Sequence, residues 1–166
     1  LSLAIRFRMP YLVHLILMTL KENIYRLCVE MVQTKINLLQ QQLHDLTSSA
    51  GNETKRTAGD KHETALAMLQ IEQENNSRQL QDALQQKTIL EKIDPTLQTE
   101  QAVRGSIITT NSGIFFLSLG LGKLKTQQET IFAVSPEAPL GKLLVLKKEG
   151  DEFHFNQTDY KIISVE

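Results

Sequence analysis

The sequence predicts an α+β protein in which a long antiparallel helical hairpin precedes a small antiparallel sheet domain with one short helix. Apolar residues recur at helical spacing over most of residues 18–94, whereas short β-branched and aromatic runs between turn residues dominate beyond residue 104. At 166 residues the chain has room for one domain or two small ones. We therefore expect a hairpin at 18–94, a linker at 95–103 and a C-terminal domain at 104–166, after an N-terminal extension at 1–17.

The first helix of the expected hairpin runs from about Leu20 to Leu46. Its apolar positions advance by three and four residues, with a sideways shift where Met31 is followed directly by Val32. The full stripe is Leu20, Ile24, Leu27, Met31, Val32, Ile36, Leu39, Leu43 and Leu46. Residues 48–52, Ser-Ser-Ala-Gly-Asn, are typical of a helix stop and a loop.

The second helix is expected from about Asp60 to Ile93, where Asp94 and Pro95 end it because the residue before proline avoids helical geometry. Its apolar positions are sparser and residues 73–78 are polar. Those positions are Leu66, Leu69, Leu80, Leu84, Leu90 and Ile93. Such a segment fits one arm of a solvated two-helix hairpin, with an arm of thirty residues reaching about 45 Å.

The C-terminal third reads as a small sheet with one helix. Residues 111–113, Asn-Ser-Gly, predict a hairpin turn, and Leu140 to Leu146 predicts a short helix. Five short strands are expected at residues 106–110, 114–117, 130–134, 152–155 and 161–165.

Charge and cysteine content narrow the classes of partner. A formal net charge of −1 and a pI near 6.5 provide no overall basic field, so independent sequence-specific DNA binding is not expected. The single cysteine, Cys28, excludes an internal disulfide framework and is compatible with a cytoplasmic location. We interpret Cys28 as a core or seam residue, since no activating base is indicated beside it.

The N-terminal residues 1–17 resemble a signal peptide only superficially. Arg6 and Arg8 precede an apolar stretch at residues 11–17, but no small-residue cleavage site follows. The apolar stretch is also shorter than the ~20 residues that span a bilayer, so a membrane span is not expected, and no membrane partner is assigned. Met18 stands where the first helix would naturally begin, and the leading interpretation of residues 1–17 is an upstream extension of a gene model, with a membrane-surface anchor and a genuine extra helical turn as the alternatives.

Three elements near the C-terminus stand in a distinctive order. Residues 138–144 read Ala-Pro-Leu-Gly-Lys-Leu-Leu, residues 147–151 read Lys-Lys-Glu-Gly-Asp, and residues 160–164 close with Tyr-Lys-Ile-Ile-Ser. This order and spacing resemble the C-terminal domain of the bacterial Gre transcript-cleavage factors, with Ala138 where that family usually has serine. The resemblance implies an FKBP-like fold and a preceding helical hairpin with acidic residues at its tip.

The expected tip lies at residues 59–64, Gly-Asp-Lys-His-Glu-Thr. It resembles the Gly-Asp-x-x-Glu-Asn tip of the Gre hairpin, with Thr64 in place of asparagine, so Asp60 and Glu63 occupy the positions of the family's acidic pair. Carboxylates three residues apart can face one side of a helical turn. Magnesium is commonly held by one or two protein carboxylates, with water and phosphate oxygens completing its coordination.

A structural interpretation competes for the same two acids. Asp60 followed by Glu63 at a helix start is also a capping-box arrangement, which is common and needs no metal. Nearby Lys55, Arg56 and Lys61 are candidates for RNA contact or simply part of a solvated loop. If the residues before Gly59 extend either helix, the acids move away from the apex and Glu53 becomes a third acidic group there. His62 is assigned no role.

By the resemblance, the expected function is that of an elongation factor that binds RNA polymerase. The C-terminal domain would dock at the rim of the secondary channel and the hairpin would enter it. Asp60 and Glu63 would then assist catalysis by helping to hold the polymerase's second Mg²⁺ for hydrolysis of backtracked nascent RNA, so the protein is not itself an enzyme.

Three alternatives remain open at this point. One is a Gre-fold channel regulator without cleavage activity. A second is a coiled-coil adaptor whose acids only cap the helix. The third, suggested by fold analogy alone, is a peptidyl-prolyl isomerase, whose pocket needs a cluster of aromatic residues.

Overall fold

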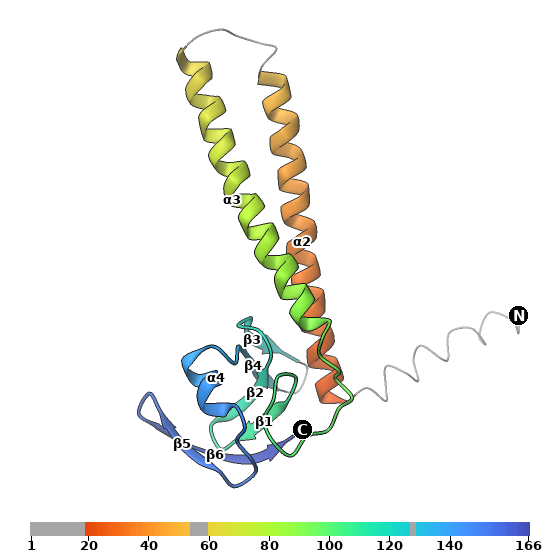
Figure 1. The fold of residues 1–166 in the computed structure, drawn as a ribbon, viewed down its shortest axis with the longest axis vertical. Helices are drawn as coiled ribbons and strands as arrows, with labels where there is room; N and C mark the ends of the chain where they lie inside the picture. The colour runs from red at the N-terminus through yellow and green to blue at the C-terminus, as the bar shows by residue number, and fades with distance from the viewer. Residues whose placement is uncertain (1–18, 54–59, 127–128) are drawn as a thin grey trace, which may run out of the picture. The chain divides into compact units, whose positions relative to one another are not determined.

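The computed structural model describes residues 19–53, 60–126 and 129–166, with side chains described except at residues 50–53 and 60–62. The predicted α+β class is confirmed: two long helices, α2 and α3, precede a six-stranded, mostly antiparallel sheet and the short helix α4 (Figure 1). The described residues form two compact units. The hairpin unit is Val29–Glu91, and the α+β unit combines residues 19–28 with Lys92–Glu166.

The start of α2, which spans Leu20–Glu53, is determined by local sequence. The Thr19 amide donates to Glu22 Oε2 at 2.7 Å, and the Glu22 amide donates to Thr19 Oγ1 at 3.2 Å. These reciprocal bonds make a capping box, which satisfies two amides that have no partner inside the helix. The spacing of Thr19 and Glu22 is a sequence signal for this helix start.

The far end of α2 corrects an expectation. The helix stop predicted at residues 48–52 is wrong, because α2 continues to Glu53. The hydroxyls of Thr47, Ser48 and Ser49 donate to the carbonyls four residues earlier, at 2.8, 3.0 and 2.9 Å. These side chains therefore satisfy their polar groups inside the helix and do not compete with it from a turn.

The apolar stripe of α2 is confirmed in its main course. In the hairpin unit Val32, Ile36 and Leu39 are buried, whereas Met31 is 44% exposed and lies off the seam. In the α+β unit Ile24 is fully buried as predicted, but Leu20 is 37% exposed, and fully buried Cys28 takes the place expected for Leu27, which is only half-buried. Cys28 is thus a core residue, as expected from its position.

Helix α3 spans Asp60–Leu90 and ends three residues before the predicted Ile93. The less exposed side chains along it include a series that advances strictly by three and four residues, as in a coiled-coil seam. That series is Leu66, Leu69, Gln73, Asn76, Leu80, Ala83, Lys87 and Leu90. The expected seam residue Leu84 is instead 45% exposed, and Ala83 takes its place with no exposed surface.

Two side-chain contacts determine how the helices of the hairpin unit are aligned. Lys87 Nζ donates to Gln33 Oε1 at 3.0 Å, and Gln73 Nε2 donates to Thr47 Oγ1 at 3.4 Å. From Gln33 to Thr47 is fourteen residues, and so is Gln73 to Lys87. The helices are therefore antiparallel and in constant register over two heptads, as a coiled-coil hairpin requires.

The sheet of the α+β unit has the strand order β3-β4-β2-β1-β6-β5. Its strands are β1 (Ile107–Thr110), β2 (Gly113–Leu117), β3 (Gly122–Lys125), β4 (Thr130–Val134), β5 (Glu152–Phe155) and β6 (Thr158–Val165). The five predicted strands are present, and β3 was missed because Gly122 and two lysines hide its single buried residue, Leu124. The sheet is not purely antiparallel, since β2 and β4 pair in parallel.

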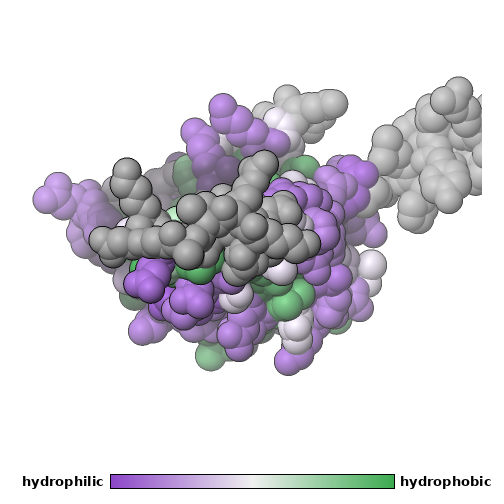
Figure 2. Space-filling view, turned by 90° about the horizontal axis from the view of Figure 1, so that it is seen from above, coloured by the Kyte–Doolittle hydropathy of each residue, from purple (hydrophilic) through white to green (hydrophobic). Residues whose placement is uncertain are grey.

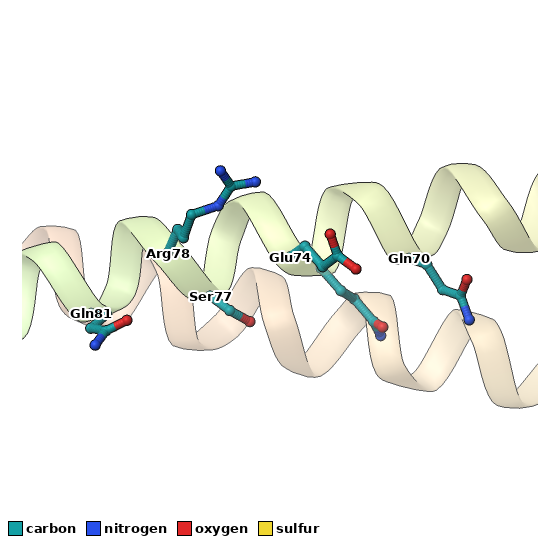
Figure 3. A pocket seen from close by; sticks show the side chains of 6 residues that line it. Gln70, Glu74, Ser77, Arg78 and Gln81 are labelled. Carbon is teal, nitrogen blue, oxygen red and sulfur yellow. The ribbon is translucent and has the colours of Figure 1, made fainter.

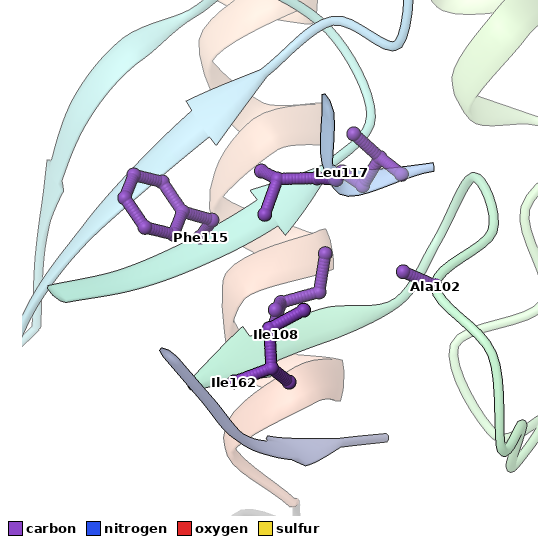
Figure 4. Packing of buried hydrophobic residues seen from close by; sticks show 6 residues of the cluster. Ala102, Ile108, Phe115, Leu117 and Ile162 are labelled. Carbon is purple, nitrogen blue, oxygen red and sulfur yellow. The ribbon is translucent and has the colours of Figure 1, made fainter. Parts of the chain in front are cut away.

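Each face of this sheet is covered by a helical segment from its own unit. One face carries the core cluster of Ala102, Ile108, Phe115, Leu117, Leu144 and Ile162, in which Leu144 comes from α4 (Pro139–Leu144) (Figure 4). Strand register places Ile107, Phe116 and Ala133 on the opposite face. The first turns of α2 lie against that face, where the thiol of Cys28 contacts Ser118. Residues 20–28 are therefore part of the α+β core.

Candidate functional site

The acidic residues expected at the hairpin tip lie at the start of α3. Asp60 is its first residue and Glu63 its fourth, so both belong to the first helical turn. Glu63 is exposed to solvent. Carboxylates in this position interact favourably with the unpaired amides and the positive end of the helix dipole.

The basic candidates around the tip are only partly described. Lys55 and Arg56 lie outside the described residues, and Lys61 is in the first turn of α3 without a described side chain. Glu53 is the last residue of α2, which confirms that some residues between the expected helices extend the first one. The six residues between Glu53 and Asp60 separate the two described helix ends.

This placement of Asp60 and Glu63 is compatible with both interpretations of the pair, as metal-holding residues and as a capping box. In the part of the chain whose side chains are described, no three or more His, Cys, Asp or Glu residues gather as metal ligands, and the Asp60 side chain lies outside that part. A pair of carboxylates on one turn would supply an incomplete coordination shell, which Mg²⁺ can fill with water and phosphate oxygens. Such a pair therefore suits a metal that another molecule also holds.

The middle of α3 presents a polar face rather than an apolar one. Gln70, Glu74, Ser77 and Gln81 line a shallow depression along the helix with Gln73 and Arg78 (Figure 3). Arg78 also donates to Asn75 Oδ1 at 3.1 Å. The face of the molecule in Figure 2 is mostly hydrophilic, with hydrophobic side chains in small separate groups. The polar residues along this part of α3 are typical of a solvated helical arm.

The Pro-Leu-Gly sequence of α4 has a clear structural cause. Pro139 occupies the first turn, where a missing amide costs nothing. A Cβ on Gly141 would lie 1.9 Å from the carbonyl oxygen of Ser135, so only glycine fits. Ala138, at the N-cap position, makes no side-chain capping bond, since alanine has no polar side-chain atom. The helix ends earlier than Leu146, because Leu146 adopts a φ of 63° and its amide donates to Ala102.

The turn at residues 147–151 is also explained by its own hydrogen bonds. The Lys148 amide donates to Asp151 Oδ2 at 2.9 Å, and the Asp151 amide donates to the Lys148 carbonyl at 3.1 Å. Gly150 has a φ of +87°, which other residues rarely adopt. Gly150 and Asp151 are therefore turn residues, while the side chains of the neighbouring Lys148 and Glu149 are exposed at the surface.

An ionic cluster precedes α4, and no sequence pattern indicated it. Arg104 donates to Glu137 at 2.5 Å and to the Ser118 carbonyl at 2.6 Å, and the Ser135 hydroxyl donates to Glu137. The hydrogen bond from Ser135, followed by the Glu137 backbone and Arg104, lowers the pKa of Glu137. Arg104 and Glu137 are 33 positions apart in the sequence, so local sequence patterns could not indicate their contact. The cluster holds in place the segment at residues 135–137, which leads into α4.

Four aromatic rings follow one another across the sheet face that carries α4. Phe132 lies 6.0 Å from Phe115, Phe115 lies 6.0 Å from Tyr160, and Tyr160 stacks on Phe153 at 4.9 Å, measured between ring centroids. They come from β4, β2, β6 and β5. The sequence showed no aromatic cluster because these rings are far apart along the chain. Phe115 is buried, so most of this row serves the core.

Two buried groups in the first turns of α2, the Cys28 thiol and the Lys21 ammonium, have structural roles. Burial raises the pKa of the Cys28 thiol to about 11, with the Ser118 hydroxyl opposing part of the rise, so the thiol is neutral and unreactive at neutral pH. Lys21 donates to the Leu97 carbonyl at 2.5 Å, and desolvation lowers its pKa against the opposing charges of Glu166 and Asp94. Both groups hold residues 20–28 against the α+β core.

In the described parts of the chain, none of the helices combines the length and the hydropathy needed to span a bilayer. A scan against models of protein families and a search of curated proteins found no match to this sequence. The resemblance to Gre factors thus rests on the sequence motifs alone.

Proposed function

We propose that this protein is a Gre-like factor that inserts its helical hairpin into the secondary channel of RNA polymerase and stimulates cleavage of backtracked RNA. The observation that carries the proposal is the location of Asp60 and Glu63 together on the first turn of α3, at the end of a coiled-coil-like hairpin. A slender polar arm can enter a channel that excludes a globular domain. Its length supports this role, since 31 residues of α3 reach about 46 Å at 1.5 Å per residue.

The proposed chemistry belongs to the polymerase, and this chain supplies ligands and orientation. Asp60 and Glu63 would hold a Mg²⁺ jointly with the polymerase, and that metal would activate water for attack on the RNA phosphodiester. Lys55, Arg56 and Lys61 would lie close to the RNA 3′ end and reduce the repulsion between its phosphates and the acids. The α+β unit would dock on the polymerase surface.

Transcript cleavage on stalled elongation complexes tests this proposal. Asp60→Asn and Glu63→Gln should each reduce stimulated cleavage at least 100-fold, because an amide keeps the shape but loses the charge that holds the metal. Polymerase binding should change little. Two acids farther along the same helix provide matched controls: Asp82→Asn and Glu72→Gln, both at exposed positions, should leave cleavage intact. Full activity in the Asp60→Asn, Glu63→Gln double variant would exclude the metal-holding role.

One observation favours a second candidate, the coiled-coil adaptor. Met68 and Ile71 of α3 are 68% and 59% exposed, and they lie three residues apart, so they share one side of the helix. Such a pair can anchor another helix in a helical groove. The cleavage assay separates the two candidates, because an adaptor would give no stimulation even with the wild-type chain.

A further inference from the structure

The two halves of the hairpin unit differ in how completely their seam is closed. The half nearer the α3 C-terminus, residues 29–39 with residues 80–91, is called the proximal segment. Five of its seam residues, Val32, Ile36, Leu39, Ala83 and Leu90, are at most 4% exposed, while Leu80, next to the distal half, and Lys87 are half-buried. The opposite half, residues 40–49 with residues 63–76, is called the distal segment.

The seam of the distal segment remains partly open to solvent. Leu43 and Leu46 of α2 and Leu66 and Leu69 of α3 are only half-buried, although each occupies a seam position. A half-buried leucine gains only part of the ~1.5 to 3 kcal/mol of a fully buried one. The distal helices are therefore held together far less strongly than the proximal ones.

Two polar residues interrupt the distal seam on α3. Gln73 and Asn76 stand between Leu69 and Leu80 in the series that advances by three and four residues. Gln73 reaches Thr47 at 3.4 Å in an exposed contact, which is long for a hydrogen bond. The Thr47 hydroxyl donates its own proton to the Leu43 carbonyl at 2.8 Å, so toward Gln73 it acts only as an acceptor. Polar groups at seam positions set register at a cost in stability.

The proximal segment also contains a polar seam residue, but its environment differs. Lys87 donates to Gln33 at 3.0 Å in a partly buried contact, and its aliphatic stem can cover the adjoining apolar surface. Fully buried Ala83 and Leu90 flank it on the same helix. Lys87 is therefore a single polar position between buried apolar residues of the seam. Gln73 and Asn76, by contrast, are two consecutive polar positions in the seam.

We propose that the distal segment opens and closes as one cooperative unit while the proximal segment stays paired. Opening separates residues 40–49 from residues 63–76 and exposes Leu43, Leu46, Leu66 and Leu69 to solvent. The interruption at Gln73 and Asn76 marks the boundary. The hairpin is thus a hinged arm whose outer half can adapt to a partner, and this holds independently of which partner binds.

Amide hydrogen exchange of the full chain, followed by mass spectrometry, tests the proposal. Peptides from residues 40–46 and residues 69–76 should exchange at least ten-fold faster than peptides from residues 30–39 and residues 80–90, and with one common protection factor. Equal protection in the two segments would overturn the proposal. A gradual rise in exchange toward the helix ends would overturn it too, since that pattern is simple fraying.

Two pairs of variants test whether the polar seam residues cause the opening of the distal segment. Gln73→Leu and Asn76→Leu close the seam and should slow exchange across the whole distal segment at least ten-fold. Gln79→Leu and Asn75→Leu make the same chemical changes at exposed positions of the same helix and should alter distal exchange less than two-fold. If both pairs slow exchange equally, the seam does not control opening and the proposal fails. If a seam variant does not fold, the wild-type comparison decides alone.

Discussion

The hairpin unit and the α+β unit are stabilised in different ways. The α+β unit buries Phe116, Leu117, Ile108 and Ile131 almost completely between its sheet and the helical segments on either face. The hairpin unit has one seam, and that seam contains Gln73, Asn76 and Lys87 among its leucines. Substitutions should therefore affect the stability of the two units very differently, while the residues proposed to act on RNA lie on the less stable of the two.

The residues of the Gre-like motifs also have different structural roles in the two units. In the α+β unit Gly141, Gly150 and Asp151 each have a packing or turn function, so their pattern is explained by the fold itself. In the hairpin unit Glu63 is exposed on the first turn of α3, where helix structure places few demands on an acid. Function is thus easier to separate from stability at the tip than around α4.

The largest contrast is expected from core truncation. Phe116→Ala should destabilise the α+β unit by about 3–5 kcal/mol, because the ring is fully buried and its loss leaves a cavity. Leu66→Ala in the half-buried distal seam should cost only about 1 kcal/mol. Urea denaturation followed by near-ultraviolet circular dichroism reports the α+β unit, and ellipticity at 222 nm reports mainly the helices. Equal losses would show that the seam is as tightly packed as the core.

A smaller effect is expected from the glycine within α4. Gly141→Ala should destabilise the α+β unit by about 1–3 kcal/mol, since the new methyl group meets the Ser135 carbonyl and forces the backbone apart. Gly120→Ala is the matched control, because a Cβ there has no atom within 4 Å. Its effect on the midpoint of urea denaturation should be negligible. A Gly141→Ala variant as stable as Gly120→Ala would contradict the close approach described here.

The smallest effect is a gain in stability. Ala138→Ser introduces a hydroxyl at the N-cap of α4, where it can accept a hydrogen bond from an amide of the first turn. The expected stabilisation is about 0.5–1 kcal/mol, visible as a raised thermal midpoint. Ala138→Val lacks the acceptor and should give no gain. A stabilisation shared by both variants would point to packing rather than capping.

The α+β class and most elements were predictable because their signals are local. The capping pattern of Thr19 and Glu22, the leucine spacing in α2 and the turn at Gly150 each act within a few residues. The continuation of α2 through residues 48–52 was not predictable from composition, because Thr47, Ser48 and Ser49 bond to their own helix. The parallel pairing of β2 with β4 and the approach of residues 20–28 to the sheet depend on distant contacts.

The same division applies to the candidate site. Asp60 and Glu63 could be placed on one helical turn from their spacing alone. The bonds of Arg104 to Glu137 and the aromatic row ending at Tyr160 depend on the folded sheet, so sequence patterns could not identify them. Residues 20–28 belong to the same compact unit as Lys92–Glu166 and cover the sheet face that carries Phe116. The α+β unit is therefore not a simple C-terminal segment of the chain.

The most direct test of the central claim is the Mg²⁺ dependence of RNA cleavage by stalled elongation complexes. If Asp60 and Glu63 hold the second metal ion, the wild-type protein should lower the Mg²⁺ concentration for half-maximal cleavage at least ten-fold. Asp60→Asn should return that concentration to the value of polymerase alone, while Asp82→Asn should behave as wild type. A wild-type protein that stimulates cleavage without shifting the Mg²⁺ dependence would contradict the account.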